Sequence, residues 1–253
     1  MHRKDLDTFF TKLLSPELFD DYCPNGLQVE GTENLKKIAF AVSATRDSIT
    51  QAVDLGVDAL VVHHGLFWNF HGTRTLTGNF ARRIFPLVQH DINLFAYHLP
   101  LDAHPNIGNA AVLGQLIDCH QQNPFGDYKG CPTGIEGLLN EPLSAKELGF
   151  KLQSVLNHEV IIASPDENQI IESVGIITGG ANSDWQLAHK AGLDAYITGE
   201  ISEHDWHESQ ENGIHMFAGG HYATEIFGIL ALMKKIQRQH PLECVFIDSD
   251  NPA

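Results

Sequence analysis

The stretch at residues 43–65, SATRDSITQAVDLGVDALVVHHG, decides the fold, because its pattern recurs at residues 179–200 as GGANSDWQLAHKAGLDAYITGE. A constant shift of 136 residues places Gly56 on Gly192. Each stretch follows a short apolar run, continues as an amphipathic segment that ends at this glycine, and then enters a second apolar run. Strand, helix and strand in this order predict a βαβ unit with parallel strands and a right-handed crossover.

The similarity extends beyond the βαβ units. Residues 92–98 (INLFAYH) and 214–221 (IHMFAGGH) each follow the second strand of their copy, and each precedes a helical pattern. We therefore predict an α/β fold of two related lobes with mixed, largely parallel sheets, the first lobe at 1–130 and the second at 131–253. Residues 120–134, rich in Gly, Pro and polar side chains, are expected to form a linker or a surface excursion.

Composition and charge exclude several classes of protein. The chain has 16 basic and 32 acidic residues, a formal net charge of −16, which repels the phosphate backbone of nucleic acids. Nucleic-acid binding would require an oligomer that gathers the scattered Lys and Arg side chains on one surface. The four cysteines are far apart and form no CxxC pair, and no apolar stretch approaches the length of a membrane span. We expect a reduced, cytoplasmic protein with no membrane or nucleic-acid partner.

Histidines follow three of the predicted strands. His63 and His64 end the apolar run ALVV, His98 ends INLFAY, and His221 follows IHMFA after two glycines. In open α/β sheets, ligands collect beyond the carboxyl ends of the strands, because the loops diverge there. Successive side chains of a strand point to opposite faces. At the end of a strand, just before Gly65, the backbone can twist, and each histidine of the pair can then serve a different metal ion.

A carboxylate accompanies the last of these histidines. His221 and Glu225 stand four residues apart on a predicted helix and therefore share a face. This face continues as an apolar stripe, so both side chains point to the interior, where they need a partner or a metal ion. Asp102 follows His98 by four residues. The predicted ligands are His63, His64, Asp102, His221 and Glu225. Imidazole and carboxylate ligands suit Zn, Mn, Fe or Ni better than Ca or Mg.

Two further residues remain open at this point. Glu200 occupies the repeat position of His64. It either lines the same crevice or caps the helix that follows it. His98 is either a group that supports the metal ligands, a ligand itself, or a histidine of the core.

Five ordered motifs resemble the Nif-three-like family, whose members are often named GTP cyclohydrolase 1 type 2 homologues. The motifs span almost the whole chain: YCPNGLQVEG (22–31), DALVVHHGLFW (58–68), FAYHLPLDAHPNIGN (95–109), DAYITGEISEHD (194–205) and GGHYATE (219–225). The resemblance implies a two-lobed α/β fold with a dinuclear metal site in the interlobe crevice, and assembly into a ring-shaped homohexamer. It carries the family's ligand positions onto the five ligands named above. The domain that some members carry mid-chain has no room at residues 121–175.

The leading hypothesis for function is a metal-dependent hydrolase of the GTP cyclohydrolase 1 type 2 homologue kind, which acts on a nucleotide-like or other small polar substrate. Two divalent ions (Zn, Fe, Mn or Ni) would activate water, and Glu200 or His98 would act as catalytic residues that move protons. The chain has no P-loop, and its candidate phosphate partners are few: Arg46, Arg74, Arg82 and Arg83. The alternative is a non-enzymatic metal-binding scaffold or metal-insertion factor. An enzyme keeps a coordination position open to water, whereas a structural site is closed by protein groups.

Overall fold

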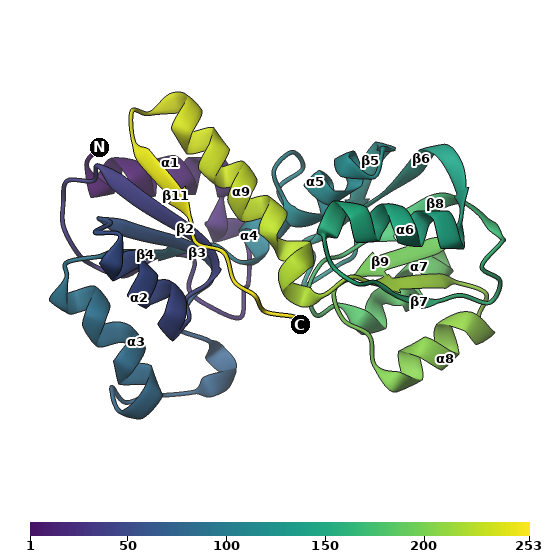
Figure 1. Ribbon diagram of the computed structural model, residues 1–253, viewed down its shortest axis with the longest axis horizontal. Coiled ribbons are helices and arrows are strands. Elements are labelled where there is room, and N and C mark those ends of the chain that lie inside the picture. The colour runs from purple at the N-terminus through teal and green to yellow at the C-terminus, as the bar shows by residue number, and fades with distance from the viewer. The chain divides into compact units, whose positions relative to one another are not determined.

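The computed structural model describes residues 1–253, which form two mixed β-sheets and the helices that cover them. The chain divides into two compact units. Unit 1 comprises Met1–Leu101 and Ile229–Asp250, and unit 2 comprises Asp102–Gly228 and Asn251–Ala253. Figure 1 shows each unit as a sheet with its own helices. No helix is both long enough and apolar enough to cross a membrane.

Unit 1 is built on a five-stranded sheet of order β1-β4-β3-β2-β11. Strand β1 is antiparallel to β4, and the other neighbours are parallel. The elements are α1 (Arg3–Leu14), β1 (Gly26–Val29), β2 (Lys37–Ser43), α2 (Arg46–Asp54), β3 (Ala59–His64), α3 (Gly78–Gln89), β4 (Asn93–Ala96) and β11 (Glu243–Phe246), with short 3-10 turns at Pro16–Leu18 and Asn69–His71. Helix α4 (Leu99–Asp102) and helix α9 (His221–Gln239) each contain residues of both units.

Both faces of this sheet are buried, which explains why its central strands are continuous apolar runs. On one face, Leu60 of β3 packs in a cluster with Ile49 of α2 and Ile84 of α3. On the other face, Phe95 of β4 contacts Phe10 of α1, with ring centroids 6.2 Å apart. Helices on both faces leave the carboxyl ends of the parallel strands as the place where polar side chains can gather.

Unit 2 is built on a six-stranded sheet of order β5-β6-β8-β9-β10-β7. Strands β8, β9 and β10 run parallel, whereas β5, β6 and β7 each pair antiparallel with a neighbour. Its elements are α5 (Asn109–Leu116), β5 (Cys119–Phe125), β6 (Gly134–Ser144), α6 (Ala145–Leu156), β7 (Ile161–Ala163), β8 (Ile170–Ile176), a 3-10 turn (Asn182–Asp184), α7 (Trp185–Ala191), β9 (Ala195–Thr198), α8 (Glu203–Glu211) and β10 (His215–Ala218). The α/β class with mixed sheets is therefore confirmed. Most strand pairs of unit 1 are parallel, whereas unit 2 contains both parallel and antiparallel pairs.

The repeat predicted from the sequence is present in the strand order. The order β1-β4-β3-β2 of unit 1 corresponds to β7-β10-β9-β8 of unit 2. The registers agree as well, because Ile38 pairs with Ala59 and Val174 pairs with Ala195, two pairs that the shift of 136 residues superposes. The two βαβ units, β2-α2-β3 and β8-α7-β9, are confirmed as parallel and adjacent.

The limits of the two units differ from the predicted boundary at residue 130. Strand β5 pairs with β6 in unit 2, and β11 pairs with β2 in unit 1. The segment that follows each copy of the repeat therefore adds a strand to the sheet of the other copy. The pattern of apolar residues identifies a strand but not the sheet that the strand joins. The predicted boundary at residue 130 therefore assigned each strand to the lobe nearest to it along the chain. The predicted linker at 120–134 is in part an edge strand.

Candidate metal centre

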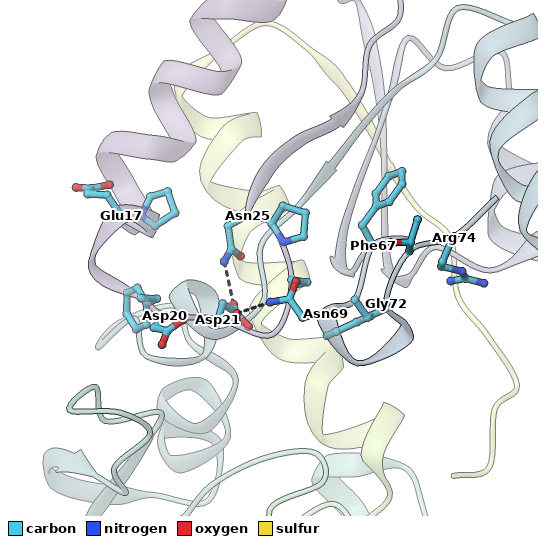
Figure 2. A pocket seen from close by; sticks show the side chains of 14 residues that line it. Glu17, Asp20, Asp21, Asn25, Phe67, Asn69, Gly72 and Arg74 are labelled. Atoms are coloured by element: carbon cyan, nitrogen blue, oxygen red, sulfur yellow. Dashed lines mark hydrogen bonds between the residues drawn. The ribbon is translucent and has the colours of Figure 1, made fainter. Parts of the chain in front are cut away.

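Two segments of unit 1, residues 16–25 and 67–74, enclose a groove with a volume of about 980 Å³ (Figure 2). Two residues that line this groove, Asp21 and Trp68, also contact histidines. These histidines follow the parallel strands β3 and β4 at their carboxyl ends.

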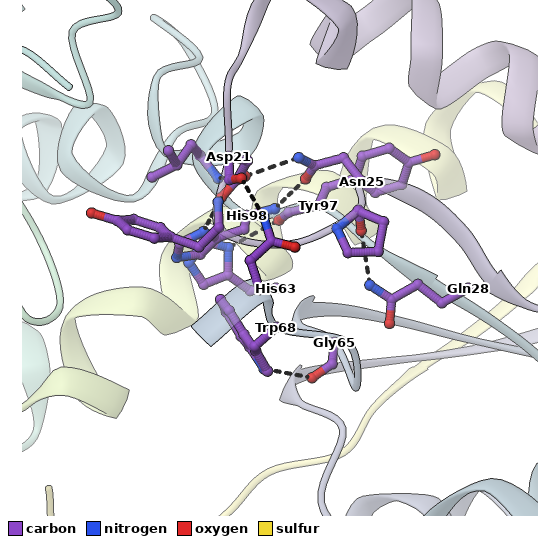
Figure 3. A network of polar contacts seen from close by, with 12 residues as sticks. Asp21, Asn25, Gln28, His63, Gly65, Trp68, Tyr97 and His98 are labelled. Atoms are coloured by element: carbon purple, nitrogen blue, oxygen red, sulfur yellow. Dashed lines mark hydrogen bonds and ion pairs between the residues drawn. The ribbon is translucent and has the colours of Figure 1, made fainter. Parts of the chain in front are cut away.

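His63, the first histidine of the pair at the end of β3, is completely buried. Its Nδ1 lies 3.0 Å from the backbone carbonyl oxygen of Tyr97, which follows β4 (Figure 3). A carbonyl oxygen only accepts hydrogen bonds, so Nδ1 carries the proton and Nε2 carries the lone pair. This tautomer is the one that metal-ligating histidines adopt when a protein group holds the other ring nitrogen.

His64 is held in the same way by the neighbouring strand. Its Nδ1 lies 3.0 Å from Oγ of Ser43, the residue that pairs with it in the register of β2 and β3. The ring centroids of His63 and His64 lie 4.6 Å apart. The two imidazoles are therefore close together, although consecutive side chains of a strand normally point to opposite faces. A side chain at Gly65 would overlap the side chain of Gln28. Glycine at this position therefore leaves the room that the side chains of Gln28 and Ala96 occupy directly after the pair.

His98 joins this pair from the end of β4. The candidate ligand atoms of His63, His64 and His98 all lie within 4.8 Å of one another. The Nδ1 of His98 donates a hydrogen bond of 2.8 Å to the carboxylate of Asp21. All three imidazoles are thus held at Nδ1. We call His63, His64 and His98 the histidine cluster.

Asp21 belongs to the candidate site, although the sequence did not single it out. Its side chain is only 2% exposed. Besides His98, its carboxylate accepts hydrogen bonds from the backbone N–H groups of Tyr22 and Leu99 and from the side-chain amide of Asn25. Burial alone would raise the pKa of Asp21, but the hydrogen bonds and the charge of His98 lower it below its ordinary value. The signal for this residue was its position immediately before the motif YCPNGLQVEG.

Cys23 lies close to Asp21 and His98, and the three could form another group of ligands. Two features argue against that group. Both oxygens of Asp21 already accept hydrogen bonds. Burial and the neighbouring Asp21 carboxylate raise the pKa of the Cys23 thiol far above its usual range, which keeps it protonated.

Unit 2 brings a different set of side chains to the carboxyl ends of its strands. The Nδ1 of His221 donates a hydrogen bond of 2.6 Å to Glu200, which follows β9. Its Nε2 lies 3.1 Å from the carboxylate of Glu225, one turn further along α9. Burial alone would lower the pKa of His221, but the bonds to Glu225 and Glu200 raise the pKa to about 9. The prediction that His221 and Glu225 share a helix face is confirmed.

Glycine leaves the space that the buried carboxylate of Glu225 occupies. The Glu225 side chain is 4% exposed. Gly179 has a φ of +69°, and a Cβ on this residue would collide with the Glu225 carboxylate. Two independent requirements, a left-handed backbone and room for an acidic side chain, therefore fix glycine at this position.

Asp102 lies in unit 2, at the end of α4. Its carboxylate accepts a hydrogen bond of 2.8 Å from the side-chain amide of Asn109. The Oδ1 of Asn109 in turn accepts the backbone N–H of Gly228 at 2.6 Å, in the same helix as Glu225. Asn109 is fully buried and links Asp102 to α9. It is a second residue that the sequence did not identify as part of the site.

The predicted site residues thus form two groups. Unit 1 holds His63, His64 and His98 in the histidine cluster, and unit 2 holds Asp102, His221 and Glu225 together with Glu200. The groups differ in charge, because the first offers imidazoles alone whereas the second places one imidazole between two carboxylates. Both offer nitrogen and oxygen donors of the kind that divalent transition metals prefer.

Comparison with known proteins assigns the family. Residues 1–252 match the model of a family described as Duf34/NIF3 (NGG1p interacting factor 3). The chain belongs to this family. It is 42% identical to a protein of Vibrio cholerae and 37% identical to one of Escherichia coli, both named "GTP cyclohydrolase 1 type 2 homolog", and each alignment covers 100% of both chains. The resemblance seen in the sequence motifs is confirmed.

Solved structures show the same fold. A structure described as "protein ybgI, unknown function" superposes with a TM-score of 0.92 at 37% identity, and each chain is covered completely. A protein of Thermus thermophilus superposes with a TM-score of 0.91 at 30% identity, also over 100% of both chains. Reduced HcgD from Methanocaldococcus jannaschii, at 23% identity and a TM-score of 0.86 over 98% of each chain, shares the fold.

Proposed function

We propose that the protein is a metal-dependent hydrolase of a small polar substrate, and that His63, His64, Asp102, His221 and Glu225 bind two divalent ions. The observation that supports this proposal most strongly is the anchoring of the histidines. His63 donates from Nδ1 to a carbonyl oxygen, and the Nδ1 of His64 lies 3.0 Å from Oγ of Ser43. These contacts fix both rings through Nδ1, as the outer partners of metal-ligating histidines do.

The donor set fits the proposed ions. Imidazoles and carboxylates suit Zn, Mn, Fe or Ni, whereas Ca and Mg prefer oxygen ligands alone. An ion of this kind polarises a bound water molecule and lowers its pKa toward neutrality. The carboxylate of Glu225, which is kept in a buried position, contributes negative charge that offsets the charge of the ions.

The chain supplies two candidates for proton transfer. His98 is held at Nδ1 by Asp21 in the orientation that lets Nε2 accept a proton, and it lies in the histidine cluster. Glu200 orients His221 through a hydrogen bond of 2.6 Å, and its side chain is 52% exposed. An exposed carboxylate can exchange protons with solvent. We assign His98 to proton transfer at the substrate and Glu200 to the orientation of His221 and to exchange with water.

An experiment that does not depend on the substrate tests the reaction class. A hydrolase leaves a coordination position to water, whereas a closed site binds protein groups only. Protein loaded with Mn²⁺ should therefore speed the relaxation of water protons well beyond a control with the metal in a closed chelate. Absence of this enhancement in a loaded protein would contradict the hydrolase and favour the metal-binding scaffold or metal-insertion factor.

Turnover gives the second arm of the test. We expect loaded protein to hydrolyse at least one member of a panel of small polar compounds, including the GTP that appears in the name of the relatives. His98→Gln should retain the metal and lose most of the rate, by a factor of about 10²–10⁴. His90→Ala, which changes an exposed histidine at the end of α3, is the matched control and should behave like the unaltered protein. Equal rates for His98→Gln and the control would remove His98 from the mechanism.

A further inference from the structure

The groove of unit 1 is large enough for a small molecule, and two of its lining residues contact His98 of the histidine cluster. Its volume of about 980 Å³ lies in the range of natural ligand pockets. Trp68 lines it, and the Trp68 ring centroid lies 5.1 Å from that of His98. Asp21 lines it as well and accepts the hydrogen bond from the same imidazole. A ligand in the groove therefore meets two residues that contact His98, the residue to which we assign proton transfer.

One end of the groove carries a negative charge. Glu17, in the turn after α1, is exposed and makes no hydrogen bond or ion pair in the structure. Asp20 lies on the same segment and also lines the groove. Figure 2 shows both carboxylates at the same end of the labelled lining. A ligand with an ammonium group would find an acceptor of opposite charge at this end.

The other end carries a positive charge. The Arg74 guanidinium stacks on the ring of Phe80, 3.8 Å from its centroid, and Nη1 contacts the carbonyl oxygen of Leu66 and Nδ1 of His71. These contacts hold the side chain in place and leave Nη2 and Nε for a ligand. Figure 2 shows Arg74 at the end opposite to Glu17. A planar guanidinium held in this way is suited to bind a carboxylate through two parallel hydrogen bonds.

The middle of the groove is apolar with one amide. Phe67 and Trp68 line it, and Trp68 is stacked on Phe70 with ring centroids 5.5 Å apart. Asn69 donates from its side-chain amide to the backbone oxygen of Asp21 at 3.3 Å. The Oδ1 of Asn69 is left as an acceptor for an N–H group. Aromatic faces and one amide acceptor complement an apolar side chain next to a peptide bond.

We propose that this groove binds a short zwitterionic peptide, with its ammonium group at Glu17, its carboxylate at Arg74 and an apolar side chain against Phe67 and Trp68. Charge argues against a nucleoside triphosphate. Three carboxylates and one guanidinium line the groove, and the whole chain carries a net charge of −16. A polyanion is repelled by this surface, whereas a zwitterion is not.

The ligand becomes a substrate if the proposed hydrolase function holds, and this part of the inference rests on it. Hydrolysis of the peptide requires only water. The water oxygen forms a bond to the carbonyl carbon, the C–N bond breaks, and both water protons pass to the departing nitrogen. The products are a carboxylate and an ammonium ion, and no oxidant or reductant takes part.

Binding to metal-free protein tests the groove separately from the hydrolase. Full-length protein dialysed against EDTA is titrated calorimetrically with glycyl-phenylalanine, with the N-acetylated and C-amidated form of the same peptide, and with GTP. We expect the free peptide to bind, the capped peptide to bind more weakly, and GTP to bind least. Glu17→Gln and Arg74→Gln should each weaken the free peptide by about fivefold, a typical effect of one exposed charge-assisted contact. Arg238→Gln, which changes an exposed arginine in the last turn of α9, is the matched control and should leave the affinity unchanged.

Three results would overturn the inference. They are no binding of the free peptide by folded protein, equal affinities in Glu17→Gln, Arg74→Gln and the control, and tighter binding of GTP that Arg74→Gln abolishes. Both positions are exposed, and thermal melting of each variant verifies the fold, in particular for Arg74→Gln, which removes the stack on Phe80. If the peptide binds as expected but loaded protein fails to cleave it, the contradiction falls on the proposed hydrolysis and not on the groove.

Discussion

The two units have the same four-strand arrangement but different chemistry at the strand ends. In unit 1, β3 ends in His63 and His64, and in unit 2 the equivalent positions after β9 hold Gly199 and Glu200. The repeat therefore supplies a similar edge twice, and substitution at a few strand-end positions makes one edge rich in imidazole and the other rich in carboxylate. The difference teaches that the fold supplies the location of the site, whereas individual side chains supply its function.

The largest expected effect tests the space reserved in unit 2. Gly179→Ala should destabilise the protein by about 3 kcal/mol, because the new Cβ meets both a left-handed backbone and the Glu225 carboxylate. Gly192→Ala has a similar φ of +75° but open space around it, so it should cost only about 1 kcal/mol. Urea denaturation measures both. Equal costs would show that the Glu225 carboxylate is not confined by this glycine.

The next comparison concerns the carboxylates that hold Nδ1 of a histidine in each unit. Asp21 is 2% exposed and Glu200 is 52% exposed. Glu200→Gln should weaken metal binding by about tenfold, because Glu200 holds the proposed ligand His221. Asp21→Asn acts through His98, so it should leave the metal affinity unchanged and lower the rate of hydrolysis. Competition with a chelator of known affinity measures both affinities. A larger loss of affinity in Asp21→Asn than in Glu200→Gln would make His98 a metal ligand and contradict its assignment to proton transfer.

The helix-ending glycines of the repeat test its equivalence. Gly56 and Gly192 have φ values of +61° and +75°, and a Cβ on either would meet nothing within 4 Å. Gly56→Ala and Gly192→Ala should therefore cost about the same, about 1 kcal/mol each. The free energy of unfolding from chemical denaturation checks this. If the two losses in the free energy of unfolding differ by about 2 kcal/mol or more, as for a core mutation, the glycine has different structural roles in the two copies.

The smallest effect is the dependence of stability on pH through Asp21. Its pKa is lower in the folded protein than the ordinary 3.8, so the contribution to stability is complete above that value and is lost as the pH falls through the folded pKa. Asp21→Asn removes this titration. As the pH falls below about 4, the stability of the variant should therefore fall less steeply than that of the unaltered protein. Parallel curves from thermal denaturation would contradict the hydrogen-bonded state of Asp21.

The sequence predicted what depends on local pattern. The two βαβ units followed from apolar and amphipathic periods, and the shared face of His221 and Glu225 followed from their spacing on α9. The exchange of β5 and β11 was not predicted, because strand pairing depends on contacts that no local period encodes. Asp21 was missed for a similar reason. It lies in an irregular segment, and its partner His98 is 77 residues away.

The measurement that tests the central claim most directly is the metal content per chain after equilibration with Mn²⁺ and removal of free metal. It compares the unaltered protein with His64→Ala, Glu225→Gln and the control His90→Ala. Two ions per chain are expected in the unaltered protein and in the control, with a clear loss in the variant of each unit. Full occupancy in both His64→Ala and Glu225→Gln would contradict the assignment of these strand-end residues as ligands.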